Sequence, residues 1–359
     1  MIDAKKIVRT RHHELLVLLI LAAGLTLAIF GLNYRQTFHG YASRPTESQY
    51  LDSQRENVRQ LRKEGDRQAA RDAAHESYAS FVKSNYQLYF HYGNDPMPTD
   101  HNGLTVNIYF ILAAYAVGVL VAAMDGLGGF DRFLAGLGIA RRKLYWAKMR
   151  VFLPLIGGLS LAVPGLMLIL FYLTFPARLI NLTATGMLAI LVYNFALTVT
   201  AFIFGHTLGQ LIGRPLVLAV GATLLIPLLA NGLEHATVLW SALTHWLNIG
   251  GSFLRPGEAY WWLLAGCLVV SGGAAWLGAR LYRSVSMERR RTLLTAPHLR
   301  WPLVIGVTLL LTLNFGTVGA HGLQPWPTLV WPLLGLAVGL AWQFWPAVTA
   351  VTRRLQRVD

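Results

Sequence analysis

The chain has 359 residues, of which 54% are hydrophobic and only 13% charged, and its formal net charge is +14. Several apolar runs reach about 20 residues, the length of a membrane-crossing helix, so the composition predicts an all-α integral membrane protein and excludes an ordinary soluble domain. If the chain starts inside and crosses eight times, the whole net charge lies on the cytoplasmic face, as the positive-inside rule requires. Both termini are then cytoplasmic, and anionic membrane lipid explains the charge without a nucleic-acid partner.

The first span is expected within residues 1–33, after a basic start. This run is long for a signal peptide and lacks a usual cleavage site, so we expect an uncleaved helix. His12 and His13 stand just before the run, and we interpret them as a solvated interfacial pair rather than as metal ligands.

Residues 34–105 are polar and form an expected extracellular helical segment. Their middle, 46–92, has helix formers, few glycines and no proline, which predicts one or two helices. Aromatic residues then gather before the next span, and we favour an interfacial aromatic belt over a substrate-contacting surface. These residues are Tyr78, Phe81, Tyr86, Tyr89, Phe90 and Tyr92.

Residues 125–150 form a cytoplasmic turn after the second span, 106–124. Apolar residues spaced i, i+3, i+4 and i+7 predict a short helix with one apolar face that needs a partner to bury it. They are Phe130, Phe133, Leu134 and Leu137. A basic segment interleaved with aromatic residues follows, which is typical of a segment at the headgroup surface re-entering the bilayer. Its cations are Arg141, Arg142, Lys143, Lys148 and Arg150.

Residues 151–283 are expected to hold spans three to six. The fourth, 182–213, carries Gly205, Gly209 and Gly213 at four-residue spacing, which predicts a close helix-packing face. Residues 234–258 are too apolar for a solvated loop and too short for a span, so an outer re-entrant element is expected. A basic cytoplasmic linker at 284–300, two further spans within 301–352 and a cytoplasmic tail at 353–359 complete the predicted order.

Few polar groups stand inside the predicted spans. We interpret them as possible pathway-lining residues, because an unpaired polar group in lipid is costly. They are Asn194, His206, Gln210, Asn231 and Glu234. His206 and Gln210 lie one turn apart on one face, and hydrogen bonding between helices explains them equally well.

Enzyme signatures are missing from the sequence. The chain has no Gly-x-x-x-x-Gly-Lys-Ser/Thr phosphate loop, no His-Glu-x-x-His and a single cysteine, Cys267. We therefore expect no catalytic residue, no bound cofactor and no metal in this chain.

Two segments resemble permease subunits of the ABC-2 exporter type. The first is Asp131-Arg132-Phe133-Leu134 followed by Ala140 to Lys148, and the second is Ala279-Arg280-Leu281-Tyr282-Arg283 followed by Glu288. The resemblance implies a six-helix core with two extra C-terminal helices in a bacterial plasma membrane. It also implies a separate ATP-binding cassette subunit, which binds ATP and Mg²⁺, and a second permease chain, identical or related.

In this resemblance the 125–150 turn contains a coupling helix that docks on the ATPase subunit. The implied docking residues are Phe130, Asp131, Phe133, Leu134, Leu137, Arg141 and Arg142. The expected function is export of an amphipathic or hydrophobic peptide, drug or lipid. The alternatives are a non-transporting sensor or immunity protein that binds a peptide through 34–105, and a lipid-modifying membrane enzyme, which the lack of a catalytic constellation disfavours. For the 125–150 turn, the alternative is an amphipathic interfacial helix without a partner.

Overall fold

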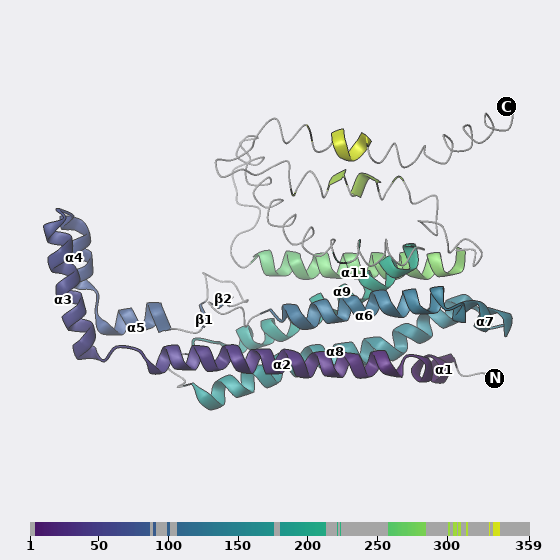
Figure 1. The fold of residues 1–359 in the computed structure, drawn as a ribbon, viewed down its shortest axis with the longest axis horizontal. Helices are drawn as coiled ribbons and strands as arrows, with labels where there is room; N and C mark the ends of the chain where they lie inside the picture. The colour runs from purple at the N-terminus through teal and green to yellow at the C-terminus, as the bar shows by residue number, and fades with distance from the viewer. Residues whose placement is uncertain are drawn as a thin grey trace, which may run out of the picture.

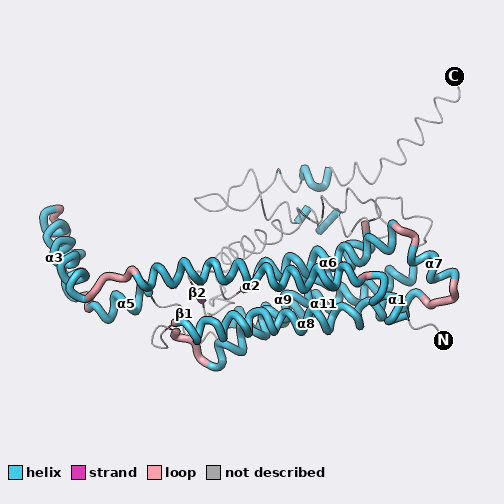
Figure 2. Tube along the Cα trace, turned by 60° about the horizontal axis from the view of Figure 1, so that its bottom comes forward, coloured by secondary structure: helices cyan, strands magenta, loops and turns pink. Residues whose placement is uncertain are grey.

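The computed structural model describes residues 4–86, 89–90, 99–100, 106–175, 180–212 and 258–284, together with isolated positions between 221 and 337. Within these ranges the regular secondary structure is helical, as Figure 2 shows, except for one antiparallel pair of two-residue strands. These are β1 (Tyr89–Phe90) and β2 (Thr99–Asp100). The predicted all-α class is confirmed for this part of the chain.

Five helices in the described ranges are long and apolar enough to cross a membrane. They are α2 (His13–Ala42), α6 (Ile108–Leu127), α8 (Arg141–Thr174), α9 (Ala184–Leu211) and α11 (Glu258–Ser284). The shortest, α6, has 20 residues and spans about 30 Å, the thickness of a hydrocarbon core. The protein is therefore membrane-embedded, and these helices correspond to predicted spans one to four and six.

The remaining predicted spans lie outside the described residues, apart from single positions and the short stretches 304–306 and 333–337. This applies to the fifth span, to the outer element at 234–258, to the linker at 284–300 and to the two spans within 301–352. The total of eight spans stays a prediction.

Helices α6 and α9 form the most extensive helix pair, and glycine allows their close approach. A Cβ atom added to Gly209 would lie 2.7 Å from the Val119 carbonyl oxygen, closer than real Cβ contacts. Gly205 and Gly118 meet the opposing backbone even more closely. The predicted close-packing face is confirmed at Gly205 and Gly209, whereas Gly213 lies outside the described residues.

Helix α8 begins earlier than the predicted third span, which was expected to start at residue 151. It starts at Arg141 and continues through Pro154 and Pro164 as one helix of 34 residues. The basic segment expected at the headgroup surface is therefore the first turns of a long helix. The cations of this segment differ in exposure: Arg142 and Lys143 are exposed, whereas Lys148 is fully buried.

The segment after α2 contains three helices where one or two were expected: α3 (Glu47–Lys63), α4 (Arg67–His75) and α5 (Tyr78–Tyr86). The Thr46 side chain caps α3 in a capping box with Gln49, and Asp66 caps α4. The Gln54 amide donates to the carbonyl oxygens of Ala73 and Glu76, at 2.6 and 2.7 Å, which closes α3 and α4 into a hairpin.

Two of the aromatic residues expected in an interfacial belt, Tyr78 and Phe81, pack inside this segment. Tyr50 of α3 is buried, with ring centroids 4.5 Å from Phe81 and 5.6 Å from Tyr78. The Tyr78 hydroxyl donates to the Pro45 carbonyl oxygen at 2.9 Å. These rings thus supply a small core for helices that have few other apolar residues.

Two short helices stand at the opposite end of the bundle from α3 and α4, as Figure 1 shows. Helix α1 (Ala4–Arg11) precedes α2 and packs on α8, and its Val8 side chain is fully buried. Helix α7 (Phe130–Gly136) connects α6 to α8. Positive φ angles at Gly129 and Gly138, 70° and 78°, form the turns on either side of α7 and favour glycine there.

Candidate functional site

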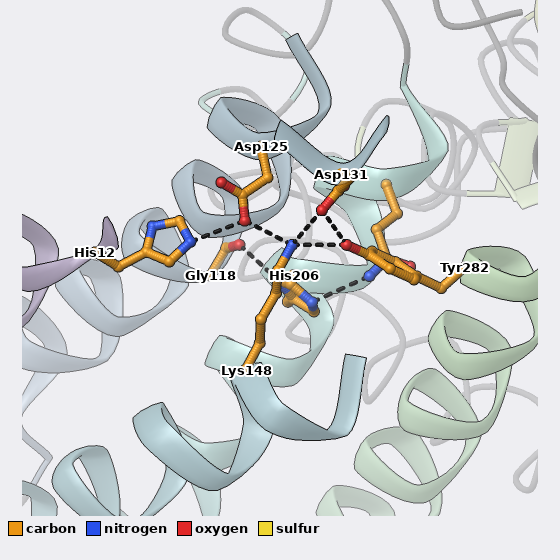
Figure 3. A network of polar contacts seen from close by, with 8 residues as sticks. His12, Gly118, Asp125, Asp131, Lys148, His206 and Tyr282 are labelled. Atoms are coloured by element: carbon orange, nitrogen blue, oxygen red, sulfur yellow. Dashed lines mark hydrogen bonds and ion pairs between the residues drawn. The ribbon is translucent and has the colours of Figure 1, made fainter. Parts of the chain in front are cut away.

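A buried ammonium group lies at the centre of the α7 end of the bundle (Figure 3). Lys148, two turns into α8, is fully inaccessible to solvent. Its Nζ lies 2.7 Å from Asp125 Oδ2, 2.8 Å from the Tyr282 hydroxyl and 3.2 Å from Asp131 Oδ1. An ammonium has three N–H donors, so these three contacts satisfy Lys148 completely.

The acceptors around Lys148 come from three other helices. Asp125 lies near the end of α6, Asp131 lies in α7, and Tyr282 lies near the end of α11. Both carboxylates are buried, and Tyr282 donates its hydroxyl hydrogen to Asp131 Oδ1. Because buried charges are stable only when paired, each of these groups requires the others.

His12 lies between the end of α1 and the start of α2, and it joins this network. Its Nε2 lies 2.8 Å from Asp125 Oδ2, and because a carboxylate only accepts, Nε2 carries the hydrogen. The imidazole also packs edge-on against Phe152, with centroids 5.9 Å apart. We call His12, Asp125, Asp131, Lys148 and Tyr282 the ion network.

The expectation that His12 and His13 form a solvated pair is wrong for His12. His13 is exposed, whereas His12 is 1% exposed. The sequence contained a signal for this difference. His12 follows Val8 by four residues and precedes Leu15 and Leu19 by three and seven, and all four form one buried stripe along α1 and α2.

Charge is not fully balanced inside the ion network. Two buried carboxylates face one ammonium, so Lys148 alone does not neutralise them. Within the described residues, His12 Nδ1 and Asp125 Oδ1 have no hydrogen-bond partner.

Two of the predicted pathway residues lie together beside the ion network. His206 of α9 is fully buried, its Nδ1 donates to the Gly118 carbonyl oxygen of α6 at 3.3 Å, and the Gln210 amide donates to its Nε2 at 3.0 Å. The His206 ring also packs against Tyr145, with centroids 5.7 Å apart. This is the helix-to-helix hydrogen bonding that the sequence left as an alternative to a pathway.

Asn194, also predicted to line a pathway, lies far from His206 along α9. Twelve residues separate the two, about 18 Å in a helix. Asn194 Oδ1 accepts from the backbone N–H of Asn107 at 2.7 Å, which satisfies a donor at the start of α6. The structure therefore does not bring Asn194 together with His206 and Gln210, and Asn231 and Glu234 lie outside the described residues.

The predicted docking residues of α7 divide between two faces. Leu134 and Asp131 are buried, at 1% exposure each, whereas Phe133 and Leu137 are exposed at 62% and 49%. Phe130 is half-buried. The helix ends at Gly136, so Leu137 leaves the helical register and the expected single apolar face does not form. Of the two predicted docking arginines, Arg141 is half-buried and Arg142 is exposed.

The ion network can connect helices and move them together, because it links α6, α7, α8, α11 and the α1–α2 junction through groups that are satisfied mainly by one another. Among the described residues, no three His, Cys, Asp or Glu side chains are grouped so that they could hold a metal ion.

Comparison of the chain with models of protein families, with curated proteins and with solved structures finds no match.

Proposed function

We propose that this chain is the membrane-spanning permease subunit of an ATP-driven exporter of the ABC-2 type. A separate ATP-binding cassette subunit hydrolyses ATP, and a second permease chain completes the pathway in a bacterial plasma membrane. The substrate class is an amphipathic or hydrophobic peptide, drug or lipid. The α7 end of the bundle and both termini face the cytoplasm in this proposal, in accordance with the distribution of positive charge.

The two-faced character of α7 is the observation that carries the proposal. Outward, Phe133 presents a ring that is 62% exposed, on a short helix between two membrane-crossing helices. Inward, Asp131 is held by Lys148 of α8 and Tyr282 of α11. A force applied by a partner to the outer face is therefore transmitted to two spans through ionic contacts rather than through apolar surfaces that can slide.

This arrangement supports a coupling mechanism. ATP binding closes the partner's nucleotide-binding sites and displaces α7. The ion network then moves the ends of α6, α8 and α11 together, and the spans change between inward-open and outward-open arrangements as rigid bodies. Lys148, Asp131 and Tyr282 act as positioning residues in this step.

The docking surface is narrower than the spacing in the sequence predicts. Phe133 and Leu137 form its apolar part, while Arg142 and Lys143 on the first turn of α8 are exposed and suited to acidic partner residues. Leu134 and Asp131 belong to the interior, so their substitution is expected to affect folding as well as docking.

Co-purification from native membranes tests the proposal. We expect the tagged wild-type chain to bring a stoichiometric ATPase with it in mild detergent, and Phe133→Asp to lose that partner because it places a charge at the centre of an apolar contact. Leu51→Asp is the matched control. Leu51 is also an exposed large apolar side chain, but it lies on α3, at the end of the molecule opposite α7. The readouts are mass spectrometry and ATPase activity of the eluate, with insertion checked by membrane fractionation.

The contrary result is a wild-type chain that purifies alone and without ATPase activity, under conditions that keep known transporter complexes intact. That result would reject the permease and favour the sensor or immunity alternative, with α3, α4 and α5 as the peptide-binding part. If Phe133→Asp and Leu51→Asp lost the co-purifying ATPase to the same extent, α7 would be rejected as the docking site.

A further inference from the structure

A groove opens on the surface where α1 meets the start of α7. Its volume is about 490 Å³, and it is lined by Lys6, Ile7, Thr10, Arg11 and Phe130. The docking residues Phe133 and Leu137 are not among these lining residues. Phe130 does line it, and its ring stacks on the Phe133 ring with centroids 6.4 Å apart, so the groove adjoins the surface proposed to receive the ATPase subunit without including Phe133 or Leu137.

The described lining of the groove combines two cations with apolar walls and includes no anion. Lys6 and Arg11 are exposed, and the Arg11 guanidinium lies 5.3 Å from the centroid of the Phe130 ring, which holds it along the groove. Ile7 and Phe130 contribute apolar surface beneath these charges. The complementary ligand has a negatively charged group attached to an apolar body.

The depth of the groove relative to the membrane indicates which of these ligands it meets. Helix α1 ends at Arg11 and the apolar α2 begins at His13, so the groove lies within two turns of the start of a membrane-crossing helix. Val8 of α1 is fully buried, and α1 packs against α8, which fixes α1 on the bundle. The cations are therefore held where phospholipid headgroups meet the acyl region.

We propose that this groove binds one anionic phospholipid, with its phosphate at Lys6 and Arg11 and the glycerol end of its chains against Ile7 and Phe130. The bound lipid contacts both α1 and α7, and so stabilises α7 in the position seen here. This inference depends on the groove alone and holds whether or not an ATPase subunit docks at Phe133.

Native mass spectrometry of the purified full chain with added phosphatidylglycerol or phosphatidylcholine tests this site. We expect Lys6→Gln/Arg11→Gln to weaken binding of the first phosphatidylglycerol about fivefold for each cation removed, with phosphatidylcholine unaffected. Arg142→Gln/Lys143→Gln removes two exposed cations from α8 and is expected to leave that first lipid bound. Lys6→Arg/Arg11→Lys keeps both charges and is expected to bind like the wild type.

A photoreactive phosphatidylglycerol locates the lipid independently, with cross-links expected in residues 4–11 and at 130. Three results would overturn the proposal. The first is an equal loss of binding in the two glutamine double variants, which would mean general attraction to a basic face. The second is cross-linking elsewhere. The third is unchanged lipid binding in Lys6→Gln/Arg11→Gln together with loss of a co-purifying protein, which would make the groove a protein-docking site.

Discussion

Lys148 illustrates what a buried charge does in this protein. Transferring an ammonium from water to an apolar interior costs several kcal/mol, and two buried carboxylates and a hydroxyl offset that cost. Such a network adds little net stability compared with apolar side chains of the same shape. We expect its main effect to be on geometry, because its members on α6, α7, α8 and α11 satisfy one another in the arrangement seen here.

Removing this charge is expected to be strongly destabilising. Lys148→Met leaves Asp125 and Asp131 buried without their shared cation, and we expect the free energy of unfolding to fall by about 3–5 kcal/mol. Thermal denaturation of the purified protein in detergent measures the change. Lys143→Met, the same substitution at an exposed position of the same helix, is expected to change stability by less than about 0.5 kcal/mol.

A second substitution distinguishes the ion network from simple loss of packing. Asp131→Asn is expected to cost less in the Lys148→Met background than in the wild type, because the carboxylate no longer has a partner to lose. Additive effects of the two substitutions would show that Lys148 and Asp131 do not interact energetically.

Among the helices, the α6–α9 pair shows how small residues replace the hydrophobic effect in a membrane. Because lipid is as apolar as leucine, helices associate through close packing, and glycine provides the closest approach. Gly118 of α6 and Gly205 and Gly209 of α9 meet the opposing backbone directly. Gly118 lies against the backbone of Phe202 and His206, and the His206 ring donates to the Gly118 carbonyl oxygen.

Adding a single methyl group at this contact is expected to separate the two helices. Gly205→Ala places a Cβ against the Tyr115 carbonyl oxygen, and we expect overpacking to cost about 1–3 kcal/mol. The control is Gly158→Ala on α8, where the added Cβ meets nothing within 4 Å and higher helix propensity is expected to keep or raise stability. The thermal denaturation midpoints of both variants test this, and equal midpoints would contradict the close contact.

The whole molecule is polarised along its long axis. Helices α3 and α4 project at one end, and α1 and α7 lie at the other (Figure 1). Helix α2, with 30 residues and thus about 45 Å long, extends beyond a hydrocarbon core of about 30 Å. We therefore expect the two ends on opposite sides of the membrane, and the charge distribution predicts that the α7 end is inside.

Thiol labelling tests this orientation. In a Cys267→Ser background, we expect Asn57→Cys on α3 to react with a membrane-impermeant maleimide in intact spheroplasts. Lys143→Cys on α8 is expected to react only after permeabilisation. Both positions are exposed in the fold, so burial does not explain a difference. The reverse pattern would place the basic face outside and contradict the proposed direction of coupling.

The sequence by itself determined the membrane class, the positions of five spans, the glycine contact at Gly205 and Gly209, and the short helix around Phe133, because each is a local pattern of residue types along one helix. Only the tertiary structure decided that Lys148, expected at the headgroup surface, is a buried partner of Asp125 and Tyr282. It also decided that His12 is buried and that α7 turns Asp131 inward. The physical reason is that the burial of a charge depends on its partners. Those partners lie on other helices, more than 100 positions away for His12 with Asp125 and for Lys148 with Tyr282, and a periodic pattern within one segment contains no information about them.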